Sequence, residues 1–415
     1  MVKLSRYFLV VIAVIVFAIV IPKFYWMAFE KPIRVPFVIW SCIDNDFMIT
    51  RTGDGLKRTS RNLEKTGETL TREAYEQKLP FLYVRQLLMN GTMPDSINGV
   101  DIDTHDVSQR RSTFRIRPKE INSPLPTLYP LFESQSGRAN LEMPEDFFRI
   151  TWRMEFIDAE SNKINEDKSR MFSAVLYKRG FKFPAKSING LPTTRKSCDE
   201  GYLVIDSEDQ LFHIKMIEAK PFVEKIKIPN DLKFKFIKCV DFNTKLFYAY
   251  LFSTDNNLYI LTQYDYELIK FPIENINPDL NEIKIYGDLL NFNVISVGDG
   301  FMKSEVLDRD YNLVDTYSET WNARNKRIEG EIAQFLFPFQ IKMTNKNSGF
   351  IKFFFEKTKS INWIFMSIFL IIAHFIILKK RKVKLAKHGI DFIVIALAGI
   401  FGFIAVNFFP NKFFN

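Results

Sequence analysis

The sequence predicts a mainly β domain, irregular or like a small β-propeller, with one transmembrane helix before it and two after it. Three long apolar runs predict the helices, at Tyr7–Phe29, Ile361–Leu378 and Ile390–Phe409. Runs of about 20 residues that are nearly free of charge are long enough to cross a membrane. Between them, short apolar and polar runs alternate and are broken by Asp, Asn and Gly, which is the pattern of β-strands. Similar polar turns also recur in that region.

Residues 1–29 are expected to form a short cytoplasmic N-terminus and the first transmembrane helix. Lys3 and Arg6 before the apolar run would also suit a signal peptide. A cleavage site needs small residues, whereas the chain continues with the aromatic segment Pro22–Met27, which suits a membrane–water interface. We therefore expect an uncleaved anchor, with the signal peptide as the alternative. Pro22 should bend or end the helix near its outer end.

Residues 30–109 are expected to form a membrane-proximal cap. Two extended segments come first, at Val35–Ile43 and around Phe47–Thr52. The stretch 71–89 is helical in pattern, interrupted by a proline, and a following Asn-Gly pair supplies a C-terminal stop.

Residues 110–355 are expected to form the propeller-like domain. Four eight-residue windows share an acidic fourth position and an amide sixth position: Ile157–Ile164, Ile205–Phe212, Phe252–Tyr259 and Leu307–Val314. Each reads as a strand, a polar turn and a returning strand. Spacings of 48, 47 and 55 residues suit propeller blades. The alternative is that any β-rich domain has polar hairpin turns. Met343–Phe350 is a weaker fifth copy.

Residues 356–378 are expected to form the second transmembrane helix, 379–389 a basic loop, and 390–415 the third helix with a short outer tail. The loop holds six Lys and Arg and no acid. Short loops of this kind stay in the cytoplasm. The large domain is therefore expected to be extracytoplasmic.

Small residues in the third apolar run indicate helix packing. Ala398, Gly402 and Ala405 would line one face of a helix. Such a face lets another helix approach closely, either the second span or that of a membrane partner.

The charge distribution excludes a nucleic-acid-binding surface. The net charge is +9, but residues 24–378 hold 47 basic and 47 acidic residues. The excess lies at the two ends, where it reports membrane orientation. A nucleic-acid-binding domain would carry the excess itself.

No catalytic or cofactor motif stands out, so we expect no enzyme, no cofactor and no bound metal. Asp101, Asp103, His105 and Asp106 form the best cluster for a metal, but loop acids are more often solvated. His374 lies inside an apolar run, where an ionisable residue is a functional candidate. Because it lies one turn from Lys379, a side chain that reaches the membrane interface or bonds to its own helix is the simpler explanation, with haem or metal ligation as the alternative. Cys42, Cys198 and Cys239 suit buried apolar positions, and a bridge from Cys198 to Cys239 is the alternative.

Several stretches carry a family resemblance: Met93–Ile97, Leu131–Arg138, Met143–Arg149, Gly180–Ala185, Asp199–Tyr202 and Leu211–Met216. In these the chain resembles an uncharacterised family of bacterial membrane proteins, known only as a domain of unknown function. Members of that family tend to be encoded beside ABC-transporter components. The resemblance implies a location in the bacterial inner membrane with a periplasmic domain, an accessory role, and a transporter permease as the integral-membrane partner. It implies no catalytic residues.

We therefore expect a non-enzymatic, membrane-anchored accessory or sensor protein that binds a partner or ligand on its extracytoplasmic side. The alternative is a membrane-anchored hydrolase or lectin that acts on envelope glycans or peptides.

Overall fold

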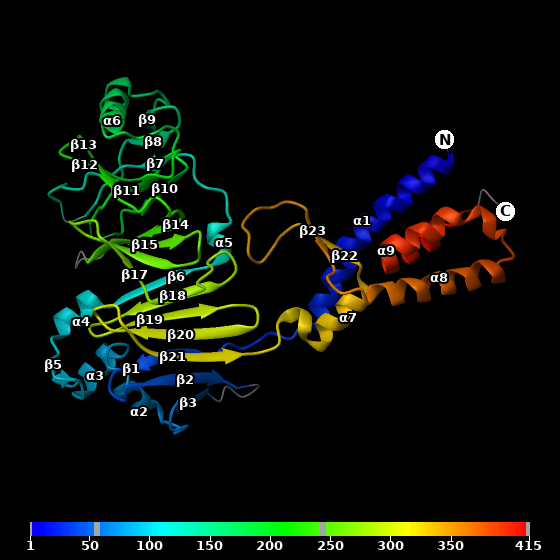
Figure 1. Cartoon of the computed structure of the whole chain (residues 1–415), viewed down its shortest axis with the longest axis horizontal. Helices are drawn as coiled ribbons and strands as arrows, with labels where there is room; N and C mark the ends of the chain where they lie inside the picture. The colour runs from blue at the N-terminus through cyan, green and yellow to red at the C-terminus, as the bar shows by residue number, and fades with distance from the viewer. Residues whose placement is uncertain (1, 54–58, 139, 197, 241–245, 412–415) are drawn as a thin grey trace. The chain divides into compact units, whose positions relative to one another are not determined.

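The computed structural model describes residues 2–53, 59–138, 140–196, 198–240 and 246–411, and these form two compact units (Figure 1). We call the unit of Met1–Val35, Gly298–Met302 and Glu319–Asn415 the helical unit. Pro36–Val297 and Lys303–Ser318 form the β unit. The expected boundary at residue 355 differs from this division, because residues 319–355 belong with the helices.

The β unit consists of sheets in which each strand pairs mostly with the next in sequence. The five larger sheets are β1–β3 (Phe37–Ser41, Asp46–Thr52, Thr59–Leu63), β7–β9 (Tyr129–Pro130, Asp146–Ile150, Met154–Asp158), β10–β13 (Ser187–Gly190, Tyr202–Ile205, Leu211–Ile217, Lys220–Ile226), β14–β17 (Phe234–Cys239, Phe247–Ser253, Leu258–Thr262, Leu268–Lys270) and β18–β21 (Glu282–Gly287, Phe292–Val297, Phe301–Leu307, Leu313–Thr320), with β6 (Ser112–Ile116) beside β18.

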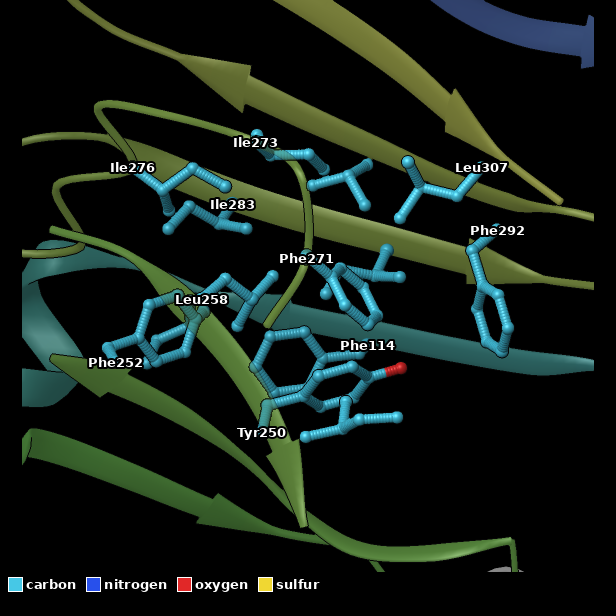
Figure 2. Packing of buried hydrophobic residues seen from close by; sticks show 14 of the residues in the cluster. Phe114, Tyr250, Phe252, Leu258, Phe271, Ile273, Ile276, Ile283, Phe292 and Leu307 are labelled. Atoms are coloured by element: carbon cyan, nitrogen blue, oxygen red, sulfur yellow. The ribbon is translucent and has the colours of Figure 1, made fainter. Parts of the chain in front are cut away.

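These sheets are stacked face to face, and apolar side chains fill the space between neighbours (Figure 1). Strand β15 packs against a core on each of its two faces, which explains why its sequence is almost wholly apolar. Tyr250 and Phe252 point to the core shared with β18 and β19, whereas Ala249 and Leu251 point to the core shared with β11 and β12. A strand buried on both faces needs apolar residues at every position. Figure 2 shows the first of these cores, with Phe114, Tyr250 and Phe271 at its centre.

Three of the four repeat windows form β-hairpins, as predicted. They connect β11 to β12, β15 to β16 and β20 to β21. The prediction was wrong for Ile157–Ile164: the chain reverses there, but it leaves as helix α6 (Glu166–Lys178). Within the described residues no strand pairing closes the stack into a ring. The sheets resemble propeller blades in their strand order, without a closed propeller being detected.

The sequence of helix α6 contains an N-terminal capping signal, although the segments around it have the pattern of β-strands. Asn165 caps it by accepting a hydrogen bond from the backbone N–H of Lys168, at 3.1 Å. Acidic residues Glu166 and Asp167 occupy the first turn, where they suit the helix dipole. Phe172 and Leu176, four residues apart, are fully buried in the core under β9.

The expected helical stretch in the cap is confirmed. Helices α2 (Arg72–Gln77) and α3 (Val84–Asn90) flank the proline, and Gly91 ends α3 with a left-handed φ of 65°. The remaining short elements of the β unit are β4 (Ser96–Ile97), β5 (Val100–Asp101), α4 (Thr104–Arg110) and α5 (Pro118–Ile121).

The helical unit contains three helices that are long and apolar enough to cross a membrane. These are α1 (Val2–Phe29), α8 (Trp363–Lys380) and α9 (Gly389–Phe408). Pro22 does not end α1, which continues seven residues beyond it. The other elements are η1 (Arg324–Lys326), α7 (Ile328–Leu336), β22 (Phe339–Lys342), β23 (Phe354–Lys357) and η2 (Leu385–Lys387).

Helix α9 is not one straight span, because its backbone reverses at Gly399. That glycine has φ 55° and ψ −129°, far from helical values. Arg6 bonds both to Asp391 at the start of α9 and to the carbonyl oxygen of Phe409 at its end, each at 2.8 Å. In a straight helix these two positions would lie about 27 Å apart. The helix is therefore a hairpin of two arms, 389–398 and 400–408, each about 15 Å long.

This hairpin corrects two expectations. The end of the third run returns to the end of the unit where α1 begins, which differs from the expected single straight helix (Figure 1). Ala398, Gly402 and Ala405 do not share one helix face, because Gly399 separates the first of them from the other two. All three are buried. Gly402 packs on the first arm: a Cβ there would lie 2.5 Å from the carbonyl oxygen of Val394.

We predict that Gly399→Ala destabilises the helical unit. A side chain at this φ is strained, at a cost of about 1–3 kcal/mol, and the new Cβ would lie 3.1 Å from Cδ of Pro338. Thermal unfolding of the full chain in detergent measures the loss. The matched control is Gly389→Ala, where the Cβ meets nothing within 4 Å. Equal stability of both variants would contradict the hairpin turn.

Candidate functional site

A cluster of buried ionisable residues joins the three long helices of the helical unit at one end. Arg6 comes from the start of α1, His374 from α8, and Asp391 from the first turn of α9, while His388 precedes α9. All four are at most 6% exposed. An ionisable residue between membrane-spanning helices is costly to bury, so such a residue is a candidate for function.

Asp391 is the centre of the cluster. Its Oδ1 accepts a hydrogen bond from Arg6 Nη1 at 2.8 Å, and its Oδ2 lies 2.9 Å from His388 Nδ1. The position near the N-terminus of α9 also favours a negative charge. Arg6 bonds the carbonyl oxygen of Phe409 as well. One arginine and one aspartate thereby connect α1 to both arms of the hairpin.

His388 and His374 have ring nitrogens that make no hydrogen bond among the described residues. His388 uses Nδ1 for Asp391 and leaves Nε2 unpartnered, whereas both nitrogens of His374 are unpartnered. The ring of His374 is held by edge contacts with Phe392 and Phe403, at centroid distances of 5.3 and 6.4 Å. Buried polar atoms normally have a partner, so these nitrogens are available to a ligand.

A cavity of about 290 Å³ lies beside the cluster. His374, His388 and Asp391 line it together with Arg381 and Asn411. Asn411 is 6% exposed, and its Nδ2 also has no partner in the part of the chain that the structure describes. Within the same residues, His374, His388 and Asp391 form a group of potential metal ligands, with one atom from each lying within 4.8 Å of the others.

The metal candidates from the sequence lie elsewhere, in the β unit, and are not brought into such a group. Asp101 pairs in β5, and Asp103 caps α4 by accepting a hydrogen bond from the N–H of His105. His105 and Asp106 are exposed, with 3.9 Å between Nδ1 and a carboxylate oxygen. Of the residues singled out in the sequence, only His374 lies in the buried cluster.

The buried histidine of the β unit serves the fold. His213 on β12 is fully buried, and its Nε2 lies 2.6 Å from the carbonyl oxygen of Glu200. A carbonyl only accepts, so Nε2 carries the proton, and Nδ1 accepts from the hydroxyl of Tyr266 at 2.8 Å. Burial, together with the smaller effect of the nearby charge of Lys215, lowers the pKa of His213 to about 3. Both nitrogens are thus used within the fold.

We predict that removing one partner of the Arg6–Asp391 pair destabilises the helical unit more than replacing both partners by apolar residues. Arg6→Met alone leaves a buried carboxylate, which typically costs about 3–5 kcal/mol. The double variant Arg6→Met/Asp391→Leu should recover most of that loss. Unfolding of the full chain in detergent measures both. Arg138→Ala, which breaks an exposed pair with Glu142, is the control and should change little. If the loss of stability in the double variant equalled the sum of the losses in the two single variants, Arg6 and Asp391 would not be coupled.

We predict that His213 makes the β unit less stable in acid. In the unfolded chain a histidine binds its proton below pH 6.5, whereas folded His213 stays neutral down to about pH 3. Stability therefore falls as the pH drops from 6.5 towards 3, by up to about 1.4 kcal/mol per pH unit. His213→Phe should flatten this dependence, and His105→Ala, at an exposed site, should not. Unfolding titrations between pH 7 and pH 5 check the slopes.

Comparisons with known proteins place the chain in a family. A model described as a domain of unknown function (DUF4857) matches residues 37–303. No curated protein matches the sequence.

Two solved structures are similar at low level. The Dos1 propeller has a TM-score of 0.27 and 9% identity, over 44% of this chain and 46% of that chain. The β-propeller domain of Myceliophteria thermophila Cps50 (Swd1) has a TM-score of 0.25 and 11% identity, over 68% of each chain. The chain thus spans less than half the length of the Dos1 propeller, and neither TM-score is high enough to define the fold. The match to residues 37–303 covers more than half of the chain, which therefore belongs to the DUF4857 family.

Proposed function

We propose that this chain is a non-enzymatic, membrane-anchored accessory or sensor protein. Its helical unit would lie in the inner membrane of a bacterium and bind a ligand or partner there. Its β unit would form an extracytoplasmic surface for a partner. The partner would be a membrane subunit, such as the permease, of an ABC-type transport system, as the family resemblance implies.

One observation carries the proposal: ionisable side chains with unpartnered atoms gather between the apolar helices. Arg6, His374 and His388 each retain at least one nitrogen that has no partner among the described residues. The buried histidine of the β unit, by contrast, uses both ring nitrogens within its own fold. The polar atoms that are free to bind a ligand thus lie in the helical unit, which favours a role in sensing or assembly in the membrane.

The orientation follows from the positive charge of 379–387. With the hairpin geometry of α9, the chain crosses the membrane twice, at α1 and α8. Both the basic loop and the end of α9 would then face the cytoplasm. The β unit, which lies between the two crossings in sequence, would face outward. Tyr25 and Trp26 near the outer end of α1 support this placement, because aromatic residues favour the membrane interface.

The experiment combines orientation with assembly in the full chain. After replacement of the three native cysteines, Asp255→Cys should react with an impermeant thiol reagent in intact spheroplasts. Leu385→Cys and a C-terminal epitope should both be shielded. Detergent extraction of the epitope-tagged chain from its native membrane should recover transporter membrane subunits in near-equal amounts.

The outcomes separate the parts of the proposal. An accessible Leu385→Cys would overturn the orientation. A shielded loop with an accessible C-terminal epitope would overturn the hairpin and restore a third crossing. Purification without any transporter subunit would overturn the accessory role.

A further inference from the structure

The geometry points to a binding site for one divalent transition-metal ion, formed by His374, His388 and Asp391. This inference deepens the proposed function, on which it rests, by naming the ligand class of the buried cluster. Two imidazoles and one carboxylate form a donor set that binds zinc and related metals in proteins.

The distances between the donor atoms suit a single ion. One ligand atom from each of the three residues lies within 4.8 Å of the other two. Two atoms that each lie about 2.0–2.2 Å from one zinc ion are at most about 4.4 Å apart. Three atoms spread evenly around one ion lie at most about 3.8 Å apart, so the three side chains would close by up to about 1 Å to bind a metal. His388 already uses Nδ1 for its 2.9 Å contact with Asp391 Oδ2, which leaves the unpartnered Nε2 as its ligand atom.

The ring nitrogens of His374 make no hydrogen bond of normal distance and angle in the described part of the chain, and the side chain of Asn407, which lines the same cavity, lies close to the ring. Neither of its nitrogens has a partner, although the residue is only 3% exposed and lines the cavity. An unpartnered buried polar group costs free energy, so a bound ion would remove that cost. The ion would also join α8 to the first arm of α9, since His374 and Asp391 lie on different helices.

The cavity supplies the rest of the coordination sphere. Its volume of about 290 Å³ has room for several water molecules at about 30 Å³ each. An anion is the competing occupant, because Arg381 lines the same space. The carboxylate of Asp391 also lines the cavity, whereas Arg6, its partner, does not. The lining offers two imidazoles and a carboxylate oxygen, a donor set that suits a metal ion better than an anion.

Arg6 gives Asp391 a fixed orientation. The guanidinium holds Oδ1 at 2.8 Å and leaves Oδ2 on the side of His388. Groups that orient a ligand in this way typically raise metal affinity about 10- to 100-fold. Arg6 is thus a positioning residue for the site.

Cobalt binding by the purified full chain in detergent tests the site. Chelator-treated protein should take up one Co²⁺ per chain, give visible absorption bands of protein-bound cobalt, and release Co²⁺ when Zn²⁺ is added. His374→Phe removes the ligand but keeps a flat ring against Phe392 and Phe403, and it should weaken binding at least about tenfold. His388→Asn should do the same. The matched control is His105→Ala, at an exposed histidine, with unchanged binding.

Absence of Co²⁺ binding, or binding that His374→Phe leaves unchanged, would overturn the inference. Binding of inorganic phosphate in place of Co²⁺ would assign the cavity to an anion and also overturn it. Thermal unfolding of His374→Phe, which loses no hydrogen bond among the described residues, confirms that the variant is folded. Recovery of transporter subunits with the metal-free chain would leave the accessory role standing, so the two proposals fail separately.

Discussion

The helical unit depends on one buried ion pair between Arg6 and Asp391. Each partner would be costly alone among apolar helices, and together they connect α1 to both arms of the α9 hairpin. The pair fixes where the hairpin ends, and with it the position of His388 and the cavity beside it. The reversal at Gly399 and the tight packing of Gly402 on the first arm then follow, since the two arms must return to the same arginine.

Much of the β unit was predictable because its signals are local. Alternating apolar residues and polar turns indicated the hairpins from β11 to β12 and from β15 to β16, which the structure contains. Burial on both faces could be recognised in strands such as β15, whose residues are almost all apolar. Helix α6 was not predicted, because the strand pattern of the surrounding sequence led to a β prediction for this short segment as well. Its own signals, the cap at Asn165 and the spacing of Phe172 and Leu176, were nevertheless present.

The buried cluster could not be predicted, because it brings together residues that are remote in sequence. In the sequence Arg6 was only a positive residue before a predicted span, and neither His388 nor Asp391 was singled out. Of the four residues in the cluster, only His374 was recognised from the sequence as a candidate for function. Composition also made α9 look like a single crossing, since hydropathy cannot distinguish a straight helix from a hairpin. The one local clue was a glycine in the middle of the run, and glycine is common in membrane helices of either kind.

The separation of 385 residues between Arg6 and Asp391 has a consequence for biogenesis. A ribosome makes α1, and with it the arginine, long before it makes the carboxylate that neutralises the arginine. During synthesis the whole β unit emerges between these two events. If the long helices cross a membrane as proposed, the first helix waits there with a poorly solvated cation until the final hairpin arrives. A chain that stops short of α9 keeps that unpaired cation, and membrane quality-control proteases or chaperones have a physical feature by which to distinguish it from the complete protein.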